Sequence, residues 1–119
     1  GAIGGHPDTA AGASRSVVGA PLTRGRIPTI IDHVNTIVTP GAVVDVVVTD
    51  QGVAVNPRRP EVAEKLRKAG LRVYTIEQLR DKALALVGRP DPIRYLDRIV
   101  GVVMYRDNTV IDVIRQIEE

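Results

Sequence analysis

The chain has 119 residues, enough to bury a hydrophobic core, and we predict a single domain over residues 1–119. The absence of cysteine excludes disulfides and thiolate metal sites and is typical of a reducing compartment, so we expect a cytoplasmic protein. Sixteen basic and fourteen acidic residues are interspersed and leave a net charge of +2. This excess is too small to indicate nucleic acid as a partner. No apolar run reaches membrane-spanning length, so we predict no membrane association.

The first thirteen residues contain almost no large side chain and carry the strongest indication of a binding site. Gly4 and Gly5 lack a Cβ, so their backbone can adopt a positive φ and let another molecule approach the N–H groups. Asp8 and Thr9 are good N-cap residues, which predicts a short helix over the small residues that follow, with an N-terminus that attracts anions. A flexible chain end or a tight Gly-Gly turn is the alternative interpretation.

Several short strands are predicted in the segment that follows. Residues 22–26 are a basic loop around Gly25. The run 43–49 holds five valines around Asp45 and is too apolar for a half-exposed strand, so we place it at the centre of the sheet. Turn residues and β-branched runs predict strands over residues 15–20, 27–31, 35–39, 43–49 and 53–55.

A helix, a strand and a second helix are predicted in the middle of the chain. Proline in the first turn and glycine after the last turn predict a helix over residues 60–69. A strand over residues 71–74 follows. Thr75 and Gln78 have the spacing of a capping box, which opens a second helix that ends before Gly88.

Two valine- and isoleucine-rich segments, 98–106 and 110–117, complete the chain. Their β-branching favours a hairpin about Asp107 and Asn108. The apolar spacing within 110–117 also fits an amphipathic helix, which is the alternative. Together the elements predict an α/β fold with a mixed, largely parallel sheet flanked by helices, and with a C-terminal β-hairpin.

Five stretches of the sequence carry a family resemblance: residues 4–13 (GGHPDTAAGA), 20–28 (APLTRGRIP), 48–59 (VTDQGVAVNPRR), 105–107 (YRD) and 110–113 (VIDV). On these stretches the sequence resembles the C-terminal part of the citrate lyase alpha subunits, which are citrate CoA-transferases related to the family I CoA-transferases. The resemblance covers essentially the whole chain and is continuous. It implies a CoA-transferase-like half domain, that is, a C-terminal fragment of a larger subunit.

The resemblance implies a reaction and its partners. Acetyl on the CoA-like phosphopantetheine arm of an acyl carrier (gamma) subunit is exchanged for citrate, which gives a citryl thioester and acetate. A lyase (beta) subunit then cleaves the citryl group. The arm is a substrate, so no covalently bound cofactor is expected. In such transferases a glutamate carboxylate attacks the thioester and forms an acyl anhydride.

The family's glutamate precedes the Gly-Gly turn, and none of the glutamates in this sequence stands in that context. We therefore expect no catalytic nucleophile in the chain and no activity of the chain alone. The glutamates are Glu61, Glu64, Glu77, Glu118 and Glu119.

The resemblance assigns substrate- or CoA-binding roles to six residues. The N–H groups near Gly4 and Gly5 are expected to hold a substrate carboxylate or the thioester oxygen. His6 either donates a hydrogen bond to the same group, which we favour, or only caps the turn. Asp8, in the family's Gly-Gly-x-x-Asp turn, is more readily interpreted as holding the turn. The other two residues are Arg24 and Arg26, which either contact phosphates of the carrier's arm or form an ordinary solvated loop.

No metal site is expected, because His6 and His33 lie far apart and have no cluster of carboxylates beside them. Two alternative functions stay open. One is a related acyl-CoA transferase or hydrolase that uses another carboxylic acid. The other is a non-catalytic module that assembles the lyase complex. Because a fragment of a larger subunit exposes apolar surface, we also expect self-association.

Overall fold

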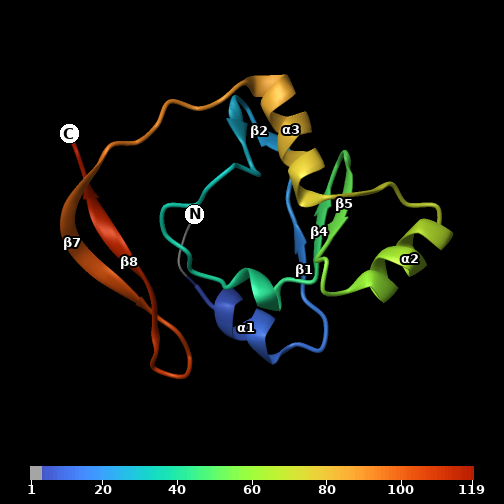
Figure 1. Ribbon diagram of the computed structural model, residues 1–119, viewed down its shortest axis with the longest axis horizontal. Helices are drawn as coiled ribbons and strands as arrows, with labels where there is room; N and C mark the ends of the chain where they lie inside the picture. The colour runs from blue at the N-terminus through green and yellow to red at the C-terminus, as the bar shows by residue number, and fades with distance from the viewer. Residues whose placement is uncertain (1–3) are drawn as a thin grey trace.

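A four-stranded mixed sheet lies at the centre of the computed structural model, which describes residues 4–119 (Figure 1). The outer strand β1 runs parallel to β4, and the other outer strand β6 runs parallel to β5. The inner strands β4 and β5 are antiparallel, because a tight turn connects them. The mixed sheet is thus confirmed. Its strands, in spatial order, are β1 (Val17–Gly19), β4 (Val46–Thr49), β5 (Gly52–Val55) and β6 (Val73–Tyr74).

Two helices follow β5 at the predicted places. Helix α2 (Pro60–Lys68) starts at its proline, and α3 (Ile76–Val87) starts with the predicted capping box. In that box Gln78 N donates to Thr75 Oγ1 over 3.1 Å, and Thr75 N donates to Gln78 Oε1 over 2.9 Å. The described residues contain no helix that is long and apolar enough to cross a membrane.

The hydrophobic core lies between α3 and the sheet. Leu79 and Ala83 of α3 are fully buried against Ala54 of β5 and Leu22, which precedes the small hairpin β2 (Thr23–Arg24) and β3 (Ile27–Pro28). Tyr74, directly before the capping box, packs against the same cluster, as expected for a hydrophobic staple.

The structure corrects two strand predictions and one loop prediction. Residues 35–39 form no strand, because the Ile37 N–H donates to Asp112 Oδ2 (2.7 Å) instead of to a neighbouring strand. The strand predicted over 27–31 ends at Pro28, which has no N–H to donate. The basic loop 22–26 is part of the β2–β3 hairpin, where Gly25 adopts a φ of 58°.

The predicted C-terminal hairpin is confirmed by β7 (Tyr95–Met104) and β8 (Val110–Ile117), which are antiparallel, and the alternative helix is wrong. Asn108 in its turn has a φ of 66°, a conformation that asparagine tolerates. The hairpin forms a separate two-stranded sheet that stands away from the central sheet (Figure 1). The Cα radius of gyration is accordingly 15.8 Å, against about 13.5 Å for a compact chain of this length.

Large apolar side chains of this hairpin are exposed along both strands. Such surface is rare on a monomer and favours association. These side chains are Leu96, Ile99, Val100, Val102, Met104, Val110 and Ile117.

We expect the isolated chain to self-associate through the hairpin, and light scattering should give a mass of at least a dimer. Ile99→Lys and Val102→Lys place charge on residues that are each 53% exposed and should shift the mass towards the monomer. Leu86→Lys, on α3 and 66% exposed, is the matched control and should leave the mass unchanged. A strictly monomeric wild-type chain would contradict the expectation.

Candidate functional site

The helix α1 (His6–Gly12) contains the first group of predicted site residues. Gly5 is its N-cap, and the Gly5 carbonyl accepts hydrogen bonds from Thr9 N and Thr9 Oγ1, each at 2.9 Å. The helix therefore begins before Asp8 and Thr9, and their predicted role as N-caps is wrong. The physical reason is Pro7, whose fixed φ suits the first turn of a helix.

The glycine pair lies on open surface. Gly5 has an ordinary helical φ of −72° and does not adopt the positive φ that a glycine at this place allows. A Cβ at Gly4 or Gly5 would meet no atom within 4 Å among the described residues, so the missing side chains leave room beside the backbone. Pro7 has no N–H, so the first turn offers the N–H groups of His6 and Asp8 to a guest.

The side chain of His6 is tied to a distant loop. His6 Nδ1 lies 2.9 Å from Thr39 Oγ1, across 33 positions of sequence. Thr39 is followed by Pro40 and the 3-10 turn Gly41–Val43. Sequence reasoning missed Thr39, because no local pattern connects it with His6.

Asp8 is exposed in α1, and its interpretation as a residue that holds the turn stays a prediction. It lies in the first turn of α1, where its negative charge is favourable to the helix dipole. Its carbonyl oxygen lies 3.4 Å from Arg106 Nη1, at the end of the C-terminal hairpin. The same guanidinium lies beside Gly12. The hairpin therefore contacts the outer side of α1.

The structure does not bring Arg24 and Arg26 together with α1. Both are exposed in the β2–β3 hairpin, which lies at the opposite end of β1 from α1 (Figure 1). That hairpin is held by Leu22 N, which donates to Asp50 Oδ1 over 2.8 Å in the turn between β4 and β5. This bond lowers the pKa of Asp50 below its ordinary value. The two arginines and the glycine pair therefore form separate surfaces.

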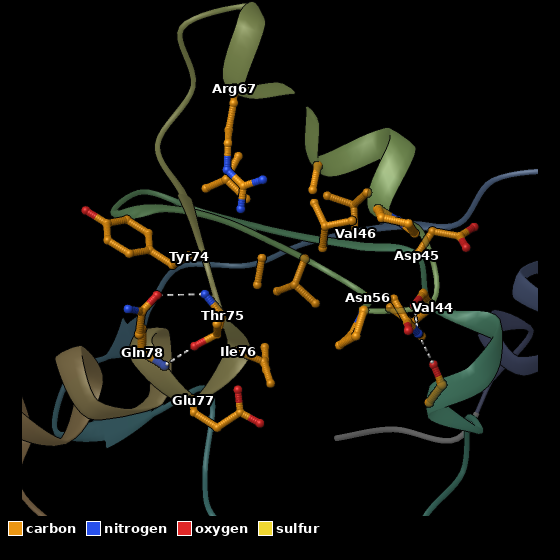
Figure 2. A pocket seen from close by; sticks show the side chains of 18 residues that line it. Val44, Asp45, Val46, Asn56, Arg67, Tyr74, Thr75, Ile76, Glu77 and Gln78 are labelled. Carbon is orange, nitrogen blue, oxygen red and sulfur yellow. Dashed lines mark hydrogen bonds between the residues drawn. The ribbon is translucent and has the colours of Figure 1, made fainter. Parts of the chain in front are cut away.

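A groove of about 610 Å³ lies between α2, the start of α3 and the sheet, and sequence reasoning did not find it (Figure 2). Valine and alanine side chains of β4 and β5 form its floor. Arg67 of α2 and Glu77 of α3 lie on opposite sides (Figure 2). In the sequence Arg67 stands between Lys65 and Lys68. Nothing in the sequence distinguishes it from the other basic residues on the solvent-exposed face of this helix.

Asp45 closes one end of this groove and is buried. Its Oδ2 accepts a hydrogen bond from Ser16 N, and its Oδ1 accepts one from Arg59 Nε, both at 2.8 Å. The Ser16 N–H first, and then the Arg59 guanidinium, hold the pKa of Asp45 below its ordinary value. Asp45 thereby joins the entry of β1 to the start of α2.

Within residues 4–119 no three His, Asp or Glu side chains gather closely enough to hold a metal ion. The described residues offer backbone hydrogen-bond donors at the start of α1, the imidazole of His6 in contact with Thr39, and the separate guanidinium groups of Arg24 and Arg26.

Comparisons with known proteins agree on one family. Residues 1–117 match the profile of the family described as citrate lyase, alpha subunit (CitF). The chain is 56% identical over 119 residues to the citrate lyase alpha chain of Escherichia coli (strain K12). The alignment covers 100% of this chain and 23% of the Escherichia coli chain. This chain is 57% identical over 118 residues to the chain from Klebsiella pneumoniae, covering 99% and 23% respectively.

A solved structure from Streptococcus mutans, described as the alpha subunit of citrate lyase in complex with citrate, superposes with a TM-score of 0.95 at 53% identity. The superposition covers 100% of this chain and 23% of the Streptococcus mutans chain. The chain thus spans about a quarter of the length of these relatives, and its place as their C-terminal part stays a prediction. On this evidence, the chain belongs to the family of citrate lyase alpha subunits.

Proposed function

We propose that this chain forms one wall of the acyl-transfer site of a citrate lyase alpha subunit. The subunit exchanges the acetyl group on the phosphopantetheine arm of an acyl carrier subunit for citrate, and a beta subunit cleaves the citryl thioester. The observation that carries the proposal is the match to alpha chains over residues 1–117. The Streptococcus mutans relative, described in complex with citrate, supports citrate as the acceptor.

The covalent step requires a carboxylate from elsewhere in the subunit. That carboxylate attacks the thioester carbonyl, the carbon–sulfur bond breaks, and the carrier thiolate leaves an acyl anhydride behind. Three glutamates of the chain are engaged in exposed ion pairs: Glu61 with Arg15, Glu64 with Lys68 and Glu118 with Arg94. Glu77 lies in the first turn of α3, on the wall of the groove.

The wall at α1 supplies donors for charge that develops on oxygen. The N–H groups near Gly4 and Gly5, with His6 beside them, hold a citrate carboxylate or the thioester oxygen, and the open space at both glycines supports such an approach. Arg24 and Arg26 contact phosphate on the carrier's arm. This contact is at some distance from the wall at α1, because both arginines lie at the other end of β1 (Figure 1).

An exchange assay with acetyl-CoA and citrate tests whether the residues at the start of α1 contribute to acyl transfer. In an intact alpha subunit that contains this chain, His6→Ala should lower the transfer rate by about a hundredfold, the effect of removing one oxyanion donor. His33→Ala is the matched control and should keep the wild-type rate, because His33 lies in the exposed loop before Thr36. Full rate in His6→Ala would refute the role of α1, and turnover by the 119-residue chain alone would refute the external nucleophile.

An assembly role is the second candidate, and the exposed apolar hairpin β7–β8 favours it. If assembly is the function, Val102→Lys weakens the complex with the other lyase subunits, and His6→Ala leaves both binding and transfer intact. Pull-down of the complex beside the exchange assay separates the two functions.

A further inference from the structure

We propose that Thr39 is a positioning residue that fixes the ring orientation and the tautomer of His6, so that His6 presents Nε2–H to a substrate oxygen. The orientation follows from contacts within this chain. The reason why Nε2–H is the useful form rests on the function proposed above.

The first step is the contact itself. His6 is exposed at the start of α1, where few neighbours limit rotation of its ring. The 2.9 Å contact between His6 Nδ1 and Thr39 Oγ1 engages one ring nitrogen. The other ring nitrogen, Nε2, makes no hydrogen bond within residues 4–119. The contact therefore leaves Nε2 as the nitrogen that can meet a ligand.

The second step is that Thr39 stands on a rigid support. Its side chain is β-branched and thus has few χ1 rotamers. Pro40, with a φ of −59°, keeps the preceding residue extended and opens the 3-10 turn Gly41–Val43. Asn56, at the end of β5, donates through Nδ2 to Gly41 O (3.1 Å) and to Val44 O (2.9 Å). These hydrogen bonds anchor the turn after Thr39 to the central sheet, so Thr39 does not stand on a free loop.

The third step is the chemistry of the pair. A neutral imidazole carries one proton, and its other nitrogen is an acceptor. When the Thr39 hydroxyl donates to Nδ1, the proton of His6 stands on Nε2. A carboxylate of citrate and a developing oxyanion both accept hydrogen bonds, so Nε2–H is the form that can bind them. Valine in place of Thr39 keeps the shape and removes the hydroxyl, whereas serine keeps the hydroxyl.

The tautomer is tested by nitrogen-15 NMR of the histidine rings in the intact alpha subunit that contains this chain. The His6 signals are identified by their loss in His6→Ala. Wild type and Thr39→Ser should show an unprotonated Nδ1 and a protonated Nε2. Thr39→Val should give averaged nitrogen shifts, while the His33 signals stay unchanged and report an intact fold. An identical Nε2–H tautomer with unaveraged shifts in Thr39→Val would overturn the inference.

The exchange assay gives the second readout. Thr39→Val should lower the transfer rate by about tenfold, the lower end of the range for groups that orient metal-ligating histidines, and Thr39→Ser should keep the wild-type rate. In the His6→Ala background Thr39→Val should have no further effect. If Thr39→Val still slows transfer without His6, positioning through His6 is refuted. If His6→Ala keeps full rate while the NMR result holds, the proposed function fails and the orientation by Thr39 stands.

Discussion

Replacing Gly52 by alanine is expected to lower the free energy of unfolding by about 3 kcal/mol, from backbone strain and overpacking together. Gly52 has a φ of 143°, which side-chain-bearing residues rarely adopt. A Cβ there would lie 2.5 Å from the Tyr74 ring and 3.1 Å from Arg72 O. Neither group can move freely, because Tyr74 packs against the core and Arg72 O accepts a hydrogen bond from Val53 N.

Urea unfolding followed by circular dichroism measures this effect. Gly19→Ala is the matched control, since Gly19 is also a strand glycine but a Cβ there would meet nothing within 4 Å. Equal unfolding midpoints for the two variants would mean that the close approach of Tyr74 to Gly52 is absent in solution.

Asparagine in place of Asp45 is expected to destabilise the protein at neutral pH and much less in acid. The Ser16 N–H and the Arg59 guanidinium lower the pKa of Asp45 in the folded state below its ordinary value of 3.8. A lowered folded-state pKa contributes stability that is present above the unfolded-state pKa and is lost as the pH falls through the folded-state pKa. Asp45→Asn removes this contribution and the ion pair with Arg59.

Unfolding midpoints of wild type and Asp45→Asn, measured from pH 7 down to pH 2, should therefore converge below the ordinary pKa of the carboxyl. Asp91→Asn, in the exposed loop after α3, is the control and should follow wild type throughout. A difference between wild type and Asp45→Asn that is constant with pH would show that the charge of Asp45 does not stabilise the fold.

The parts of the fold that local chemistry determines were predictable. Thr75 and Gln78 form the expected capping box, and Asn108 adopts the left-handed conformation expected in the hairpin turn. The failures arose where a partner lies far away in the sequence. Ile37 looks like a strand residue, but the acceptor of its N–H is Asp112, a carboxylate 75 positions away.

The same reason limited the prediction of the site. The family resemblance correctly indicated citrate lyase alpha subunits, but it could not place Arg24 relative to His6. That arrangement depends on the bond from Leu22 N to Asp50, which holds the β2–β3 hairpin at the far end of β1. Thr39 could not be predicted either, because its contact with His6 joins residues 33 positions apart in the sequence.

The separation of the C-terminal hairpin from the central sheet has a consequence for the order of folding. Strands β7 and β8 are joined by a short turn, so their pairing closes a small loop, whereas Val17 of β1 must find Val46 of β4. Loop-closure entropy therefore lets this hairpin form before β1 joins the sheet. Its valine and isoleucine side chains are then available to other chains while the sheet is still assembling. The hairpin is thus the segment at which aggregation would begin when the complete chain refolds.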